Sequence, residues 1–496
     1  MPSELAYPGV YIEELPSGVR TITGVATSIA GFVGWAGQGP TDEARRLTTW
    51  EDFVRTYGGL DSRSHLSYAV RQYFDNGGRQ AYVVRLAADG AAVAKVTIGG
   101  LELTASGPGT WAESYGVLAT PRGDAGGHFS LTFFRNAAPA GREVVEVFQN
   151  LSLDPADPRF VEFVVNEESR IVNADVGQAG TVPDTGGGVT MLDDGEDGDP
   201  LDPVGATQAF WAKAYPDTKD GGVFLLDRID LFNLLCVPGL SDPDALQKLA
   251  AHCKARRAFL IADAPESSDP KSVAPVGGLE GTNAALYFPW LRMSDPLQEG
   301  RIRAFPPSGA VAGIYARTDA TRGVWKAPAG TEATITGARA LTRTLTDAES
   351  GVVNKKGVNA LRTFDVYGQV VWGARTCQGN DEIGSEWKYV PVRRTALFLE
   401  ETLYRSLKWV VFEPNDEPLW SQIRLNVGAF MHDQFRKGAF QGSTPRDAYF
   451  VKCDRDTTTQ NDVNLGIVNI VVGYAPLKPA EFVVIRLQQL AGQLQA

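Results

Sequence analysis

The stretch LFNLLCVPGLSDPDALQKLAAHCKARRAFLIADAP, residues 231–265 of a 496-residue chain, decides the predicted fold class. It opens and closes with apolar runs, at 231–239 and 258–265, that have the length and composition of buried strands. Between them, Asp242 followed by a proline predicts the start of a helix. This strand–helix–strand order predicts a parallel or mixed sheet. The helix side chains expected to face inward are Leu246, Leu249, Ala250 and Cys253.

Similar patterns on both sides extend this α/β core. Periodic apolar residues predict one helix from residue 49 to the Gly58-Gly59 pair, and a second helix over about 64–75. The run AYVVRLAA (81–88) predicts a buried strand, whereas 306–330, rich in turn-forming residues, predicts turns. Two further strands are predicted towards the C-terminus, at 358–364 and 369–377.

Residues 90–205 differ from this core in their pattern of apolar and turn-forming residues. VTIGGLEL, HFSLTFF, EVVEVF and RFVEFVV (159–165) are short runs separated by Gly, Pro, Asp and Asn, and they predict an all-β module. The module ends in a polar stretch, 178–203, that is predicted to be a mobile surface loop. Its acidic part, 193–199, misses the register of an EF-hand, so a solvated loop is favoured while a cation site stays open.

Clear helical periodicity returns in the C-terminal part. A helix is predicted over about 395–409. A second helix is predicted with Pro418 in its first turn, an end before Gly438, and an apolar stripe formed by Leu419, Ile423, Val427, Phe430 and Met431. Three extended segments follow, the last without an obvious hairpin partner: DAYFVKCD (447–454), LGIVNIVVGY (465–474) and AEFVVIRLQQL (480–490).

Both ends of the chain carry strand-like segments that lack a local partner. GVYIEEL (9–15) is followed by no turn dipeptide, so it is predicted to be an extended arm, like 480–490. The backbone groups of such arms need partners, either within the same chain or in a sheet of another copy. The pattern alone leaves both alternatives open. In the second case the contact is head-to-tail and propagates into an open helix.

Composition excludes several classes of protein. The 47 Lys and Arg residues against 59 Asp and Glu leave a net charge of −12, which argues against a nucleic-acid partner. No apolar run approaches the ~18 residues of a membrane helix, and the sequence MPSELAYPGVYIEE lacks the features of a Sec signal. The four dispersed cysteines form no CxxC pair and are predicted to be reduced core thiols.

The sequence offers no catalytic constellation. None of its four histidines has metal-ligand spacing, and it has neither a GxSxG elbow nor a GxxxxGK[ST] loop. His252 and Cys253 are adjacent on a predicted helix and therefore point about 100° apart, which disfavours a thiol–imidazole pair. We therefore predict that the chain is not an enzyme and that it uses no cofactor and no metal.

Several stretches, in the same order along the chain, match motifs of one known family. Among them are YPGVYIEE (7–14), TSIAGFVGWAGQGP (27–40), FDNGGRQAYVVR (74–85), VFEPNDEPLW (411–420), AYFVKCD (448–454) and VGYAPLKPAEFVVIRLQQ (472–489). Through these stretches the chain resembles the tail sheath proteins of contractile phage tails and phage-tail-like injection particles. The resemblance covers nearly the whole chain and is weakest at 90–205.

The expected fold is an α/β or α+β multidomain chain, with an α/β core, an inserted β-rich domain and extended strand arms at both termini. The expected divisions are an N-terminal arm at 1–20, a middle α/β domain at 21–89 and 206–380, an outer β-rich insertion at 90–205, an inner α+β domain at 381–475 and a C-terminal arm at 476–496.

The resemblance implies a structural function. Subunits of such a protein stack as hexameric rings into a helical sheath around an inner tube, and contraction drives the tube through a target envelope without nucleotide. The implied partners are other copies of the chain, the inner tube protein, and baseplate and terminator or cap proteins, with no nucleic acid and no membrane insertion. Assembly is expected in the bacterial cytoplasm.

Two sets of site residues follow from the resemblance. Arg436 and Lys437, at the end of the second C-terminal helix, are the candidate contacts to the inner tube. The arm residues expected to add strands to neighbouring subunits are Val10, Tyr11, Ile12, Glu13, Phe482, Val483, Val484, Ile485 and Leu487.

Two other functions remain as alternatives, a soluble α/β hydrolase-like enzyme and a static filament or shell protein. An enzyme is expected to form small oligomers, and a static filament to have one lattice. Within the sheath family, the single chain departs from the split sheaths of type VI secretion. The choice between a phage virion tail and a released or cytoplasmic injection particle stays open.

Overall fold

The computed structural model describes residues 20–486, apart from five short gaps at 124–126, 138–140, 178–180, 205–206 and 276–278. The described chain forms two units. The sheet unit comprises Thr27–Thr321 and Pro328–Val390, and the C-terminal unit comprises the residues up to Ala26, Arg322–Ala327 and the residues from Pro391 on. No helix in the described ranges is both long and apolar enough to cross a membrane.

The largest sheet of the sheet unit has eight strands in the described chain, in the order β18-β17-β13-β12-β11-β1-β3-β2. The inner strands from β17 to β3 are parallel to one another, while the edge strands β2 and β18 run antiparallel to their neighbours. The prediction of a parallel or mixed sheet is therefore confirmed. The strands are β1 (Ala30–Trp35), β2 (Arg45–Leu47), β3 (Ala81–Leu86), β11 (Leu234–Cys236), β12 (Phe259–Asp263), β13 (Ala284–Phe288), β17 (Val358–Phe364) and β18 (Gly368–Val371).

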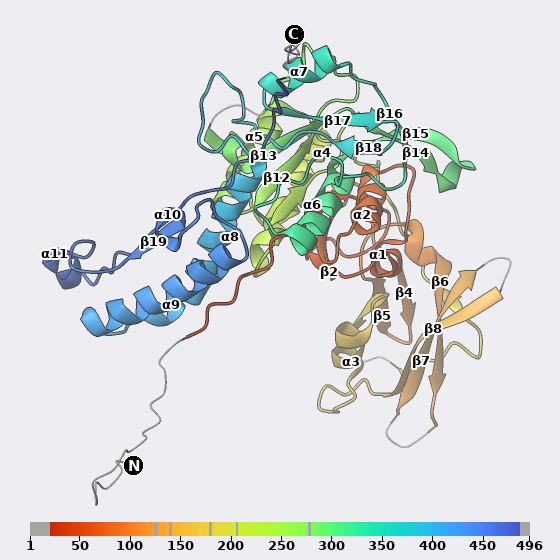
Figure 1. Cartoon of the computed structure of the whole chain (residues 1–496). Coiled ribbons are helices and arrows are strands. Elements are labelled where there is room, and N and C mark those ends of the chain that lie inside the picture. The colour runs from red at the N-terminus through yellow and green to blue at the C-terminus, as the bar shows by residue number, and fades with distance from the viewer. Residues whose placement is uncertain are drawn as a thin grey trace, which may run out of the picture. The chain divides into compact units, whose positions relative to one another are not determined.

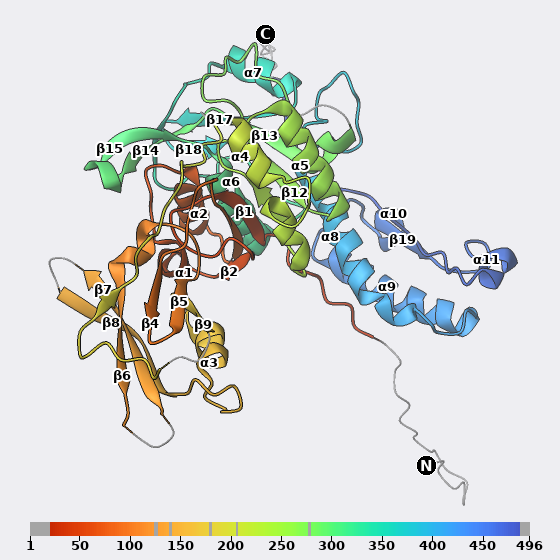
Figure 2. The ribbon, with the colours of Figure 1, turned by 180° about the vertical axis from the view of Figure 1, so that it is seen from behind.

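The helices of the sheet unit cover both faces of this sheet, with α2 and α6 on one face (Figure 1) and α4 and α5 on the other (Figure 2). The predicted cap of α5 is present, because the Asp242 side chain accepts a hydrogen bond from the Ala245 N–H at 2.9 Å. The four apolar residues expected to face inward from α5 are all buried. The helices are α1 (Trp50–Tyr57), α2 (His65–Asp75), α4 (Thr207–Ala214), α5 (Pro243–Ala255), α6 (Ser308–Arg322) and α7 (Asp347–Lys355).

Helix α6 replaces the turns that were predicted over residues 308–322, whereas the end of the predicted segment, 323–330, does contain turns. Its glycines lie where α6 packs on α2, and a Cβ atom added at Gly309 would lie 2.2 Å from the Ala69 carbonyl oxygen. A Cβ atom at Gly313 would lie 2.5 Å from the Tyr73 carbonyl oxygen. The glycines thus permit close helix packing, which sequence composition does not distinguish from a turn signal.

The carboxyl end of β12 meets the start of α6 at a buried carboxylate. Asp263 accepts hydrogen bonds from the Gly239 N–H at 3.0 Å and from the Ser308 N–H and hydroxyl at 2.8 and 2.7 Å. Burial raises the pKa of Asp263 from 3.8 to about 6, although these three donors act to lower it. The carboxylate satisfies the helix N-terminus in an otherwise apolar layer.

The insertion between β3 and α4 is mostly β-structure, with a sheet ordered β10-β6-β7-β8 and a second ordered β4-β5-β9. Its described part also holds a 3-10 helix (Thr110–Ser114) and one α-helix. That α-helix, α3 (Val161–Glu168), overturns the strand predicted at 159–165. Val161, Val164 and Val165 are buried at helical spacing, a pattern that a short run does not separate from alternation. The strands are β4 (Lys95–Ile98), β5 (Leu101–Ala105), β6 (Tyr115–Pro121), β7 (Phe129–Ala137), β8 (Gly141–Leu151), β9 (Val172–Val176) and β10 (Thr190–Met191).

A small antiparallel sheet, ordered β15-β14-β16, adjoins α2 in the sheet unit. Tyr68 of α2 donates a hydrogen bond from its hydroxyl to Asp295 at 2.8 Å, and Arg303 donates to the same carboxylate at 2.7 Å. These bonds hold the β14–β15 hairpin against the helix. The strands are β14 (Leu291–Asp295), β15 (Arg301–Phe305) and β16 (Ala338–Leu341).

The C-terminal unit is built on two long helices. Helix α8 begins earlier than predicted, and in α9 the predicted apolar stripe from Leu419 to Met431 is buried. Asp416 caps α9 by accepting the Leu419 N–H at 3.2 Å. The remaining elements are α8 (Val390–Ser406), a 3-10 turn (Lys408–Val410), α9 (Glu417–Arg436), α10 (Pro445–Ala448), β19 (Tyr449–Lys452), α11 (Gln460–Asn464) and β20 (Val471–Tyr474).

We predict that Gly309→Val destabilises the subunit by about 1–3 kcal/mol, because the new side chain forces α6 away from α2. Urea unfolding of the unassembled subunit measures this loss. The matched control is Gly351→Ala in α7, where a Cβ atom meets nothing within 4 Å, and a gain of about 0.5–1 kcal/mol is expected there. Equal stabilities for wild type and Gly309→Val would refute the close-packing account.

Asp263 predicts a specific pH dependence. Because its pKa is raised in the folded chain, its stabilising contribution is fully present below about pH 4 and is lost as the pH rises through about 6. The free energy of unfolding of wild type minus that of Asp263→Asn is therefore expected to fall by on the order of 3 kcal/mol between pH 4 and pH 7. A pH-independent difference in urea unfolding contradicts this assignment.

Candidate assembly surfaces

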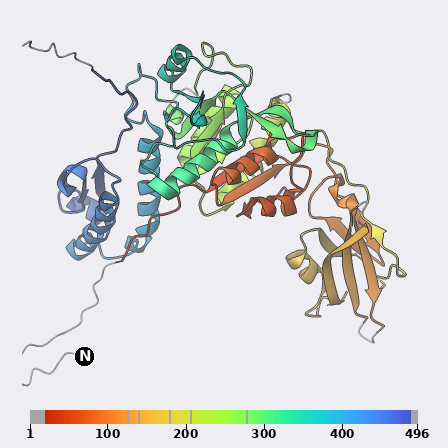
Figure 3. The same cartoon turned by 45° about the vertical axis from the view of Figure 1, so that its right-hand side comes forward.

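The C-terminal unit carries a sheet of only two strands within the described chain. β19 and β20 pair antiparallel over four residues each, and their inner face packs on α9. Figure 3 shows this dark-blue hairpin beside the two long blue helices. The outer face exposes Phe450 and Val471 to 49% and 43%. Each strand therefore has one edge that no strand of the described chain covers, an arrangement that favours pairing with another chain.

The segment after β20 contains the predicted C-terminal arm. A bridge between Phe440 and Pro476 holds its beginning, but residues 481–486 form no strand. Leu487 lies outside the described residues. The four described apolar side chains of the arm are between 73% and 81% exposed, and they are Phe482, Val483, Val484 and Ile485.

The predicted N-terminal arm residues Val10, Tyr11, Ile12 and Glu13 lie outside the described residues. The described chain begins where Arg20 donates its N–H to Asn426 Oδ1 at 3.1 Å, and its guanidinium lies 4.5 Å from the centre of the Trp409 ring. A few residues later, the Val25 N–H donates to Thr402 Oγ1 at 3.2 Å. Residues 20–25 thus bind to α8 and α9, a contact that the sequence pattern did not reveal.

Arg436 and Lys437 lie together at the end of α9, but their surroundings differ. Lys437 Nζ lies 2.6 Å from Asp433 Oδ2, so its charge is already paired within the helix. Arg436 is exposed and forms no ion pair with any described residue. Only Arg436 is therefore available as an unpaired cation. The exposed stripe of α9 that leads to it is uncharged at Ser421, Gln422, Leu425 and Ala429, and its last turn also exposes His432 and Asp433.

The acidic stretch at 193–199 is bonded to its neighbours, contrary to the mobile loop expected there. The Lys95 N–H donates to the Asp193 carbonyl at 2.8 Å, and Asp197 accepts from the Thr110 N–H and the Arg63 guanidinium, both at 2.9 Å. Partial burial acts to raise the pKa of Asp197, but these donors outweigh it and hold the pKa below its usual value. Among the described residues, no group of three His, Cys, Asp or Glu side chains is placed to hold a metal.

His252 and Cys253 do not form a nucleophile and a base. Burial raises the pKa of the Cys253 thiol, so the thiol stays protonated. Burial also lowers the pKa of His252, whose Nε2 lies 3.5 Å from Asp227 Oδ1. All four cysteines are free and buried, as predicted.

Comparison with known proteins gives the family. The model of the phage tail sheath protein central domain matches residues 228–377, and that of the phage tail sheath C-terminal domain matches residues 382–489. Together the two matches span more than half of the chain. The chain belongs to the phage tail sheath family. It is a structural sheath protein, and these relatives support neither the hydrolase-like enzyme nor the static filament.

Individual sheath proteins are similar to this chain over different shares of its length. A prophage major tail sheath protein of Pseudomonas aeruginosa is 26% identical over 266 residues, which cover 52% of this chain and 66%, just under two thirds, of that protein. The sheath complex of an extracellular contractile injection system, PVC, in its contracted state has a TM-score of 0.60 at 23% identity, over 98% of both chains. The baseplate structure of the anti-feeding prophage gives 0.58 at 23%, over 98% of this chain and 99% of that one. These structures share the fold.

Proposed function

We propose that this sheath protein polymerises as stacked hexameric rings around an inner tube and contracts to drive the tube through a target envelope. The observation that carries the proposal is the combination of an incomplete sheet, β19–β20, with an exposed apolar arm at 482–485 in the same unit. The β19–β20 sheet has open edges that can accept a further strand, and the arm at 482–485 joins no sheet of the described chain. Copies that exchange arms satisfy both, and the exchange joins them head-to-tail.

The energetics of this exchange suit a reversible but cooperative lattice. Each backbone hydrogen bond that an arm gains contributes about 0.5–1.5 kcal/mol. Burial of each exposed Val, Ile or Phe side chain contributes about 1.5–3 kcal/mol more. One arm thus stabilises the polymer by several kcal/mol while remaining a flexible connection between subunits. We assign the N-terminal arm, with Val10, Tyr11, Ile12 and Glu13, the same role.

The exposed stripe of α9 is our candidate for the inner-tube surface, with Arg436 as its charged end. A narrow stripe with few charges and one unpaired cation gives a contact that sets register and still breaks on contraction. Of the candidate pair Arg436 and Lys437, we favour Arg436, because Lys437 Nζ lies 2.6 Å from Asp433 Oδ2. The free energy that drives contraction is then the difference in free energy between two lattices of subunits, and no nucleotide is involved.

The other partners and the location follow from the same proposal. The β-rich insertion at 90–205 forms the outer part of the sheath, and baseplate and terminator proteins bind the two ends of the polymer. Relatives in an injection particle and in a prophage support both settings, a phage tail and an injection particle. Assembly takes place in the bacterial cytoplasm in either case.

Removal of residues 480–496 is predicted to abolish sheath formation without unfolding the subunit. The described part of this segment makes no strand pairing, so the thermal unfolding temperature is expected to change by less than about 2 °C. Negative-stain electron microscopy and light scattering are expected to show no tubes. Normal tubes from the truncated chain contradict arm exchange through this terminus.

Arg436→Glu is predicted to uncouple the sheath from the tube. Since the side chain is exposed, the subunit stability is expected to change by less than about 1 kcal/mol. Co-expression with the tube and baseplate proteins is expected to yield empty or contracted sheaths. Arg446→Glu, an exposed arginine on α10, makes the same charge change as a control and is expected to give tube-filled particles. Extended, tube-filled particles from Arg436→Glu remove this residue from the interface.

A further inference from the structure

An aromatic side chain projects from the loop that precedes α9. Phe412 is fully exposed, and Val411 beside it is 62% exposed. The φ angle of Phe412 is 71°, in the left-handed region that bulky residues rarely occupy. Strained backbone of this kind is found mainly at functional positions. We refer to Val411, Phe412 and Glu413 as the knob.

The knob is held in place by ordered neighbours. Asn415 Nδ2 donates to the Ile467 carbonyl oxygen at 3.0 Å, and Trp420 Nε1 donates to Asn415 Oδ1 at 2.9 Å. The Glu413 N–H donates to the Val410 carbonyl at 3.2 Å. The loop therefore presents an apolar side chain with an exposed acidic neighbour, Glu413, in a fixed conformation. Such a pair is suited to a pocket with apolar walls and a basic rim.

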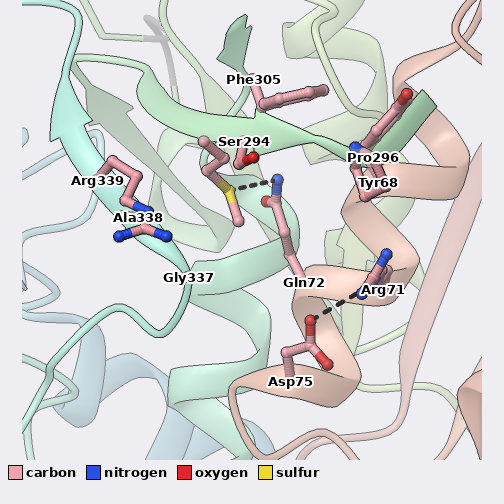
Figure 4. A pocket seen from close by; sticks show the side chains of 11 residues that line it. Tyr68, Arg71, Gln72, Asp75, Ser294, Pro296, Phe305, Gly337, Ala338 and Arg339 are labelled. Carbon is pink, nitrogen blue, oxygen red and sulfur yellow. Dashed lines mark hydrogen bonds and ion pairs between the residues drawn. The ribbon is translucent and has the colours of Figure 1, made fainter. Parts of the chain in front are cut away.

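The sheet unit contains a pocket of this kind, between α2 and the β15-β14-β16 sheet. The cavity has a volume of about 390 Å³, and Met293, Pro296 and Phe305 form apolar parts of its wall (Figure 4). Gln72 lies within it and donates from Nε2 to the Met293 sulfur at 3.2 Å. Gln72 is 3% exposed, and its buried Oε1 has no hydrogen-bond partner. An occupant that brings a donor satisfies this atom.

The surroundings of the pocket are basic, although the chain as a whole is acidic. Arg339 and Arg71 lie on two sides of the cavity (Figure 4). The guanidinium of Arg71 lies 3.7 Å from Asp75, a long ion pair, whereas that of Arg339 contacts no described side chain. The pocket thus fits an acidic and apolar group.

We propose that the knob of one copy of this chain occupies this pocket in another copy. Phe412 then packs against Phe305 and Met293, Glu413 pairs with Arg339, and a backbone N–H of the inserted loop is the donor for Gln72 Oε1. Phe412 is fully exposed in its own chain and is therefore accessible to a second copy. The contact rests on the proposed polymerisation, and it is distinct from arm exchange because it uses neither terminus.

Disulfide trapping tests the contact directly. Glu413→Cys and an Arg339→Cys chain with a larger tag are mixed, assembled and oxidised; the four native cysteines are buried and do not compete. A cross-linked band of the mixed size is expected. Arg142→Cys, on the exposed edge strand β8, replaces Arg339→Cys in the control and is expected to give less than a tenth of that band. Equal bands, or none from the Arg339 pair, overturn the proposal.

Exchange of the charges at positions 413 and 339 tests the same contact independently. Glu413→Arg and Arg339→Glu are each expected to slow sheath assembly at least tenfold, and the double variant to recover most of the rate. Arg142→Glu is the control for a charge change alone. Single variants that assemble normally, or a double variant no better than the singles, overturn the contact. Wild-type protein that forms no polymer overturns the proposed function instead, and trapping in concentrated subunits then still decides the contact.

Phe412→Gly separates the contact from folding. Glycine adopts a φ of 71° without strain, so the subunit is expected to unfold at the wild-type temperature or slightly above it. Assembly is expected to fall at least tenfold because the side chain is lost. Unchanged assembly shows that Phe412 contacts solvent or another protein, such as the tube, and overturns the proposal.

Discussion

Backbone N–H and C=O groups that lack partners are the constraint on which the C-terminal unit depends. The short strands β19 and β20 satisfy each other and pack on α9, but each leaves its outer edge open within the described chain. In the same unit, residues 482–485 are exposed apolar residues without a strand partner in the described chain. In the proposed polymer, identical copies supply the contacts that these two surfaces lack, so that assembly extends the sheet of each subunit.

The sheet unit has the opposite character, because its large sheet and the buried polar groups beside it are bonded within the unit, with Gln72 Oε1 among a few exceptions. Parallel strands bury both faces under helices, and the close approach of α6 to α2 depends on Gly309 and Gly313. Asp263 satisfies the start of α6, and the buried Arg85 guanidinium donates to the carbonyls of Ala36 and Pro108 at 2.6 Å each. Few of these contacts can shift without loss of several others. In the proposed contraction, this unit therefore moves as a rigid body, and the connections between subunits change.

Sequence patterns predicted the elements whose signals are local. The Asp242 cap, the buried stripe of α9 and four inner strands of the large sheet, β3, β11, β12 and β17, appear in the structure as expected, whereas β1 and β13 were not predicted. The wrong predictions concern sequence patterns that two different local structures can produce. Glycine at 309 and 313 serves helix packing, and the valines of α3 fit a short helix as well as a strand. Among the site residues, the sequence placed Arg436 and Lys437 at a helix end but did not show that Asp433 pairs with only one of them.

The insertion has a mechanical consequence that follows from where it joins the large sheet. The chain leaves β3 to enter it and returns through α4 to β11, and β3 and β11 pair with β1 on its two sides. Arg63 and Arg85 fasten the insertion near the same edge, through Asp197 and Pro108. A pulling force on the insertion is therefore shared by β3 and β11, and both strands transmit it to β1 through their hydrogen bonds. If the insertion forms the outer part of the sheath as proposed, drag on it is borne by β1, a strand whose six residues are all buried.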